Sequence, residues 1–118
     1  MSIENRTLLP LTTLIGDSDQ SVLSIGSKAV GAGYNKNTDG IHTIVFDLSD
    51  NWEGYIKIQG TLSLYPGNDD WFDIETYGDF STTDYAGLGT INIVGKFVWL
   101  RAAYNTQTGQ INEIRYSF

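Results

Sequence analysis

Few side chains in this sequence are of the types that catalyse reactions. The single histidine, His42, lies in the apolar segment Ile41-His-Thr-Ile-Val-Phe46, which predicts a strand residue facing solvent or a neighbouring side chain. A Ser–His–Asp relay would also need a hydroxyl on an exposed turn, and no Gly-x-Ser-x-Gly elbow is present. The Gly-rich pieces 25–28 and 31–33 lack the Gly-Lys-Ser/Thr ending of a phosphate-binding loop. The sequence therefore predicts a protein that is not an enzyme.

Carboxylates are the other candidates for chemistry, as a glycosidase-type acid and base or as calcium ligands. The acidic residues considered are Asp47, Asp50, Asp69, Asp70, Asp73 and Glu75. Most of them fall in predicted turns, such as 48–51 and 66–70, where Asp and Asn stabilise the backbone. The EF-hand spacing of a calcium loop is absent. Neither a metal nor a cofactor is predicted, although a bound calcium ion remains an alternative.

Composition narrows the classes of partner. The chain has 118 residues, the size of one domain, and no cysteine, which fits synthesis in a reducing cytosol. Its net charge of −7 comes from 14 acidic and 7 scattered basic residues, which argues against a nucleic-acid partner. No apolar run approaches the roughly 20 residues of a membrane helix, so no membrane partner is predicted. The acidic surface could serve solubility, a basic partner surface or a cation site.

Any functional site must be positioned by β-strands, because the sequence shows almost no helical periodicity. Turn signals recur at intervals of about 8–12 residues between β-branched and aromatic segments, as in a sandwich or barrel. The predicted fold is all-β: a single antiparallel β-sandwich of about eight strands over residues 21–118, preceded by an N-terminal arm or edge strand over residues 1–20. The candidate strands lie near 8–15, 21–25, 28–33, 41–48, 54–65, 71–76, 89–94, 96–105 and 110–118.

Two segments show strand periodicity in detail. In 54–64 the even positions carry Ile56, Ile58, Leu62 and Leu64, which predicts one buried face. In 97–104 both faces are largely apolar, so this strand is either central and covered on both sides or presents Phe97 and Trp99 to a partner.

The C-terminal region carries two further local signals. The loop 105–109 is predicted to be a hairpin turn in which Gly109 supplies a positive φ. Ile111 and Ile114 are three residues apart, which breaks the period of two and predicts a bulge near Asn112 and Glu113.

Aromatic residues are numerous for a small domain: Trp52, Tyr55, Trp71, Phe72, Tyr77, Trp99 and Tyr104. They could fill the sandwich, form a protein interface or offer platforms for sugar rings. The predicted interface consists of Leu8, Leu9, Leu11, Trp71, Phe97 and Trp99.

The segment Gly95-Lys-Phe-Val-Trp-Leu-Arg-Ala-Ala-Tyr104, followed by Thr108-Gly-Gln-Ile-Asn-Glu-Ile-Arg115, resembles a pattern in small virion structural proteins of tailed bacteriophages. Trp52-Glu-Gly-Tyr-Ile-Lys-Ile-Gln-Gly60 and the pair Trp71-Phe72 fit the same pattern, so the resemblance covers about residues 41–118.

This resemblance implies a jelly-roll-like sandwich that attaches to a larger shell. The implied partners are the major capsid protein or other virion proteins, and the implied assembly is a homo-oligomer, with a trimer as one option. The chain would be made in the host cytoplasm and reside in the virion. We expect a capsid decoration protein. The alternatives are a tail, neck or baseplate accessory protein, or a carbohydrate-binding module.

Overall fold

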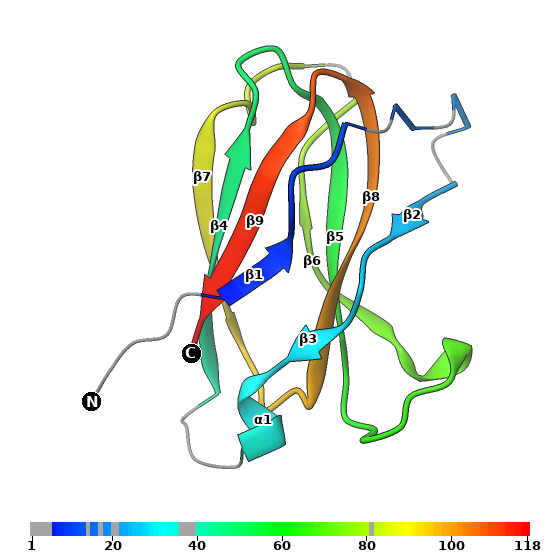
Figure 1. The fold of residues 1–118 in the computed structure, drawn as a ribbon, viewed down its shortest axis with the longest axis vertical. Coiled ribbons are helices and arrows are strands. Elements are labelled where there is room, and N and C mark those ends of the chain that lie inside the picture. The colour runs from blue at the N-terminus through cyan, green and yellow to red at the C-terminus, as the bar shows by residue number, and fades with distance from the viewer. Residues whose placement is uncertain (1–5, 14, 17, 20–21, 36–39, 81) are drawn as a thin grey trace.

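The computed structural model describes residues 6–13, 15–16, 18–19, 22–35, 40–80 and 82–118. These residues form two facing antiparallel sheets (Figure 1), which confirms the predicted all-β sandwich. The elements are β1 (Arg6–Leu9), β2 (Ser24–Ile25), β3 (Ala29–Val30), α1 (Ala32–Asn35), β4 (Ile41–Leu48), β5 (Glu53–Thr61), the 3-10 helix η1 (Asn68–Asp70), β6 (Phe72–Tyr77), β7 (Leu88–Val94), β8 (Trp99–Thr108) and β9 (Ile111–Ser117).

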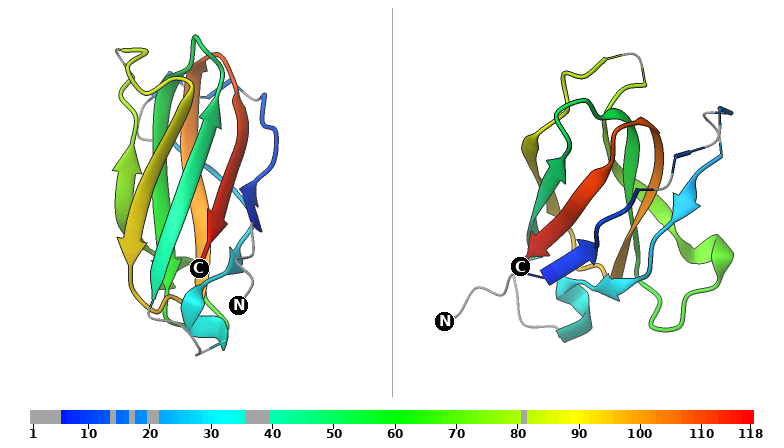
Figure 2. Two further views of the ribbon diagram at one scale, coloured as in Figure 1. Left: turned by 90° about the vertical axis from the view of Figure 1, so that its left-hand side faces the viewer. Right: turned by 45° about the horizontal axis from the view of Figure 1, so that its top comes forward.

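The strand order is that of a jelly roll. One sheet has four strands in the order β1-β9-β4-β7, and the other has the order β2-β8-β5-β6, with β3 also paired to β8. Successive long strands cross between the sheets except at β5–β6, and the first and last strands, β1 and β9, are neighbours. In the left panel of Figure 2 the four-stranded sheet lies in front of the other sheet. The jelly-roll-like topology implied by the resemblance is therefore present.

The core lies between the two layers because alternate residues of each strand point inward. On β4 the even positions from His42 to Leu48 are buried, and on β5 Ile56 and Ile58 are fully buried. The cluster of buried apolar residues comprises Leu8, Leu9, Ile44, Phe46, Leu48, Trp52, Ile56, Ile58, Ile93, Phe97, Leu100, Ala102, Tyr104, Ile111, Ile114 and Tyr116. Both sheets contribute to it, so it joins the layers.

The predicted buried face of the 54–64 segment is only half correct. Ile56 and Ile58 confirm the alternation, but Leu62 and Leu64 are exposed. β5 ends at Thr61, after which the chain leaves the sheet. The period of two has no meaning for burial once the backbone no longer pairs with a neighbour.

The predicted hairpin at 105–109 is wrong, although Gly109 does have a positive φ of 81°. β8 continues to Thr108, and β9 then starts in the other sheet, so the turn arches over the core. The predicted bulge is confirmed. Asp47 pairs with Glu113 while Leu48 pairs with Ile111, which leaves Asn112 as the extra residue.

The first half of the chain contains shorter strands than predicted. β1 ends at Leu9, and Thr12 then forms an isolated bridge to Ile111. The predicted strand 28–33 is two residues of β3 followed by the four-residue helix α1. Gly33 there donates its N–H to the carbonyl of Phe97 at 2.8 Å. No helix in the part of the chain that the structure describes is long and apolar enough to cross a membrane.

β1 belongs to the four-stranded sheet of its own chain, because it pairs with β9. Leu8 and Leu9 both point into the core, which is possible because the register shifts between Thr7 and Leu9. Residues 1–5, 14, 17 and 20 of the predicted arm or edge strand lie outside the described residues.

Candidate interaction surface

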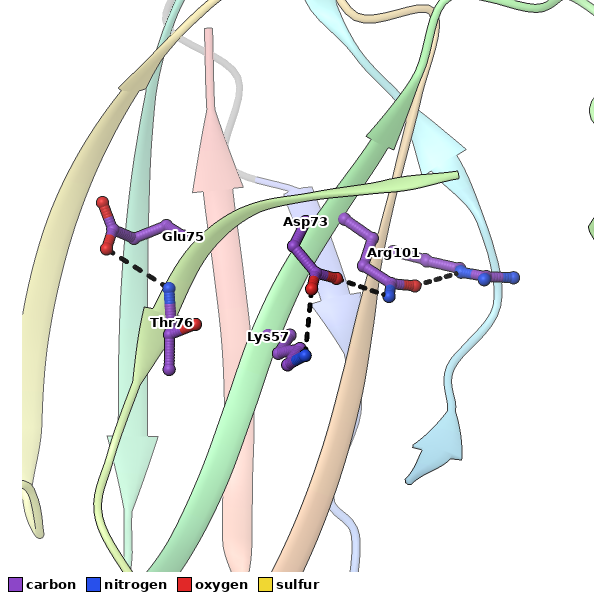
Figure 3. A network of polar contacts seen from close by, with 6 residues as sticks. Lys57, Asp73, Glu75, Thr76 and Arg101 are labelled. Atoms are coloured by element: carbon purple, nitrogen blue, oxygen red, sulfur yellow. Dashed lines mark hydrogen bonds and ion pairs between the residues drawn. The ribbon is translucent and has the colours of Figure 1, made fainter. Parts of the chain in front are cut away.

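The outer face of the five-stranded sheet carries a connected row of polar side chains (Figure 3). The Lys57 ammonium contacts Asp73 Oδ2 at 2.9 Å, and Gln59 Nε2 donates to Asp73 Oδ1 at 2.9 Å. Arg101 Nε then donates to Gln59 Oε1 at 2.8 Å. The guanidinium of Arg101 also lies over the ring of Trp71, with its Cζ 4.2 Å from the ring centroid. Strands β5, β6 and β8 thereby hold one rigid polar row.

Three charged side chains in this row have pKa values that differ from their ordinary ones. The hydrogen bond from Gln59, and then that from Lys57, lowers the pKa of Asp73. The bond to Asp73 raises the pKa of Lys57, and burial lowers the pKa of Arg101. All three groups remain charged near neutral pH, so the row is a set of paired charges rather than an acid–base pair.

Replacing Asp73 with Asn should lower the free energy of unfolding at pH 7 by roughly 0.3–1 kcal/mol, a small effect because the carboxylate is half exposed. Since folding lowers the pKa of Asp73, its stabilising contribution is present above the usual carboxyl pKa of about 4. That contribution is lost as the pH falls through the folded-state value. Urea unfolding at pH 7 and about pH 2.5 should show the stability difference between the unmodified protein and Asp73→Asn shrinking at the lower pH. The exposed Asp69 serves as the control, and Asp69→Asn should change the free energy of unfolding little at pH 7. An equal difference for Asp73→Asn at both pH values would contradict this assignment.

Trp99 anchors the lower end of the same face, where β8 begins. Its indole N–H donates to the carbonyl of Leu64 at 3.0 Å, and the ring of Tyr34 lies 5.1 Å away. The ammonium of Lys28 lies 4.7 Å from the Trp99 ring centroid. Trp99 therefore ties the β5–β6 loop to the segment around α1.

Exposed apolar side chains gather around this anchor. Tyr65 is 86% exposed and Leu62 67% exposed, and both lie on the loop that follows β5. The loop is shaped by Ser63 N–H donating to Thr61 Oγ1 at 3.1 Å and by Gly67 N–H donating to Asp70 Oδ2 at 2.7 Å. We define the contact patch as Tyr34, Leu62, Leu64, Tyr65 and Trp99. In Figure 1 the loop (green) and α1 lie at the same end of the sandwich.

The six predicted interface residues differ in how far their side chains are exposed. Leu8, Leu9 and Phe97 are buried in the core and are removed from the candidate surface, because their side chains pack between the sheets. Leu11 is exposed, but it lies beside the start of β9.

The two tryptophans of the predicted interface share the outer face of the five-stranded sheet. Both are half-buried, and each is next to Arg101: Trp71 by stacking, and Trp99 two residues along β8. β8 has ten residues and spans roughly 33 Å, so Trp99 and Leu11 lie at opposite ends of the molecule. Of the predicted set, only Trp99 belongs to the contact patch.

Sequence reasoning missed most of the contact patch. Leu62 and Leu64 were predicted to be core residues, and Tyr34 and Tyr65 were not considered. The available signal was the turn pair Pro66-Gly67 directly after Tyr65, which marks a loop. Apolar residues placed on a loop rather than in a strand are candidates for contact.

No group of three or more His, Cys, Asp or Glu side chains able to hold a metal ion occurs among the described residues. His42 is buried: its Nε2 accepts the N–H of Ala32 at 3.0 Å, so Nδ1 carries the proton and donates to the carbonyl of Gly40 at 3.1 Å. It faces neighbours rather than solvent and holds α1 to β4.

Comparisons of the chain with protein-family models, with curated proteins and with solved structures find no match.

Proposed function

We propose that this chain is a non-enzymatic structural protein of a virion, most simply a decoration protein that binds the outer surface of a phage head. The observation that carries the proposal is the contact patch, in which exposed apolar and aromatic side chains surround the half-buried Trp99 at one end of the sandwich. Exposed patches of this kind mark protein contacts in a soluble domain. The resemblance of residues 41–118 to small virion proteins of bacteriophages supports another virion protein as the partner.

The mechanism is burial of surface rather than chemistry. A contact of standard size buries on the order of 1,600 Å² in total, and each apolar Å² removed from water contributes about 25 cal/mol. Trp99 is held by Leu64 and flanked by Tyr34 and Lys28, so the centre of the patch loses little side-chain entropy on binding. Repetition over a shell lattice makes individually modest contacts collectively strong.

The proposal is tested by co-sedimenting the purified protein with virus particles from its source and counting copies per particle. The variant Leu62→Ser/Tyr65→Ser should reduce the bound fraction at least about tenfold, because two exposed anchors are lost. The matched control Leu11→Ser/Ile15→Ser removes exposed apolar surface at the opposite end and should bind as the unmodified protein does. If the control variant loses binding instead, the contact lies in the N-terminal segment.

The copy number decides between virion locations. Hundreds of copies per particle would support lattice-wide decoration, whereas a few dozen or fewer would favour a vertex, neck, tail or baseplate. No binding of the unmodified protein would overturn the proposal.

One observation favours a second candidate, a carbohydrate-binding module. The indole of Trp71 lies against the guanidinium of Arg101, which is hydrogen-bonded to Gln59 and through it connected to Asp73. An aromatic ring beside hydrogen-bonding side chains on one sheet face is a combination that can hold a sugar ring. Binding in a glycan screen that Trp71→Ala abolishes and Leu62→Ser/Tyr65→Ser leaves intact would support this candidate.

A further inference from the structure

Three of the four sheet edges are protected against pairing with another strand. β6 carries Asp73 and Glu75 and has a register shift opposite Ile58. β1 has four residues and is followed by Pro10, while β2 and β3 have two residues each. Charges, bulges, proline and shortness are the usual means by which proteins block edge pairing.

The fourth edge, β7, has none of these protections. Its seven residues, Leu88-Gly-Thr-Ile-Asn-Ile-Val94, include no charge and no proline, and they pair with β4 without a register shift. On its other side β7 has no partner strand among the described residues. In the left panel of Figure 2 it runs along the side of the sandwich that faces the viewer. Leu88 is 74% exposed and Val94 71% exposed.

The hydrogen bonds at the two ends of the β4–β7 ladder show which backbone groups of β7 point away from β4. Leu48 N–H donates to the carbonyl of Gly87, and Gly95 N–H donates to the carbonyl of Gly40, so these two pairs flank the ladder as hydrogen-bonded pairs. In an antiparallel ladder such pairs alternate with non-bonded ones. The residues of β7 bonded to β4 are therefore Gly89, Ile91 and Ile93. The N–H and C=O groups of Leu88, Thr90, Asn92 and Val94 point away from β4.

In one antiparallel register, the outward N–H and C=O groups of these four residues pair with those of the same residues in a second copy of the chain. With Ile91 opposite Ile91 of a second copy, Leu88 pairs with Val94 of that copy and Thr90 with Asn92, and the reverse pairs follow by symmetry. All four outward residues of each copy then form hydrogen-bonded pairs, with two bonds in each pair. A shift by two residues in either direction leaves an outward residue of each copy unpaired.

The side chains fit the same register. Leu88, Thr90, Asn92 and Val94 share the outer face of the sheet, so the two exposed apolar residues meet at each end. Ile91 meets its counterpart on the inner face, in the closely spaced non-bonded pair. No charge from β7 is brought against a like charge.

We propose that β7 pairs with β7 of a second copy of this chain, forming a two-fold dimer with a continuous eight-stranded sheet. A strand edge accepts one partner, and the other edges are protected, so the contact closes at two copies instead of growing into a fibre. Because each copy carries a net charge of −7, the copies repel. Salt should therefore strengthen the dimer by screening this repulsion.

The test is sedimentation equilibrium of the full chain and of two double variants. Both variants carry lysine at position 94, and they carry opposite charges at position 88. Leu88→Lys/Val94→Lys places like charges across both end pairs and should weaken dimerisation at least about tenfold. Leu88→Glu/Val94→Lys removes the same apolar groups but places opposite charges across those pairs, so it should dimerise at least about tenfold more tightly than the double-lysine variant. Both positions are highly exposed, so the fold should be retained, which circular dichroism checks.

A third variant tests the backbone contact. Thr90→Pro removes one outward N–H while the N–H groups bonded to β4 remain, so it should weaken the dimer without unfolding the chain. A monomer at about 100 µM for the unmodified chain, in high salt, would overturn the proposal. So would a dimer that is equally stable in both double variants, because the contact would then lie elsewhere.

Discussion

Replacing Trp52 with alanine should lower the free energy of unfolding by about 3–5 kcal/mol. Trp52 is fully buried, and its indole N–H donates to Thr106 Oγ1 at 3.2 Å. A Cβ at Gly78 would lie 2.7 Å from the Trp52 ring, and one at Gly54 would lie 2.8 Å from it, so two glycines make room for this side chain. The cavity left by alanine cannot be refilled by residues without side chains, so we expect the upper part of the range.

The measurement is urea unfolding of the purified variant, with Tyr65→Ala as the control for loss of an aromatic ring. Tyr65 is exposed on the loop, and its removal should change stability by no more than about 0.5 kcal/mol. Trp52→Phe should fall between the two, because it fills part of the space but leaves Thr106 without this donor. Equal losses for Trp52→Ala and Tyr65→Ala would show that Trp52 is not the packing centre of this end of the core.

The second large effect is expected at alkaline pH, from Tyr116. Its hydroxyl is buried and donates to the carbonyl of Val30 at 2.6 Å, which joins β9 to β3 across the sandwich. At pH 7, Tyr116→Phe should lower the free energy of unfolding by about 1 kcal/mol through loss of this bond. Burial raises the pKa of Tyr116 to about 12, from the ordinary value of 10.0.

This pKa difference makes the effect of Tyr116→Phe depend on pH. A group whose pKa is raised by folding stabilises fully below its unfolded-state pKa and loses that contribution as the pH rises through the folded-state value. Between about pH 10 and pH 12 the unmodified protein should therefore lose about 1.4 kcal/mol per pH unit that the Phe variant does not lose. The two unfolding free energies should meet near pH 11, and above it the variant should be the more stable. A constant difference from pH 8 to pH 12 would contradict the burial of this hydroxyl.

The proposed attachment and the proposed dimer use different parts of the surface. The contact patch is built on the β5–β6 loop and α1, whereas β7 is the edge strand of the four-stranded sheet, on the side of the sandwich away from that loop in Figure 1. A dimer joined through β7 would therefore leave two contact patches free. Two patches in one rigid unit would raise the apparent affinity for a repeating surface without any new contact.

Several local features followed from the sequence alone. The alternation of Ile56 and Ile58 with Lys57 predicted a half-buried strand, because a period of two is a property of the strand itself. The spacing of Ile111 and Ile114 predicted the bulge at Asn112 for the same reason. Gly109 marked a turn because glycine adopts a positive φ without steric cost.

Only the tertiary structure decided what covers each strand and where each turn leads. Gly109 begins an arch between the sheets rather than a hairpin, because β8 and β9 have different partners far along the chain. Leu8, Leu9 and Phe97 are buried and Leu62 is exposed, although all four are apolar. Among the described residues, β7 likewise has no strand on its outer side, because the four-stranded sheet ends there. Local periodicity fixes which side chains share a face, but burial depends on whether a distant segment lies against that face.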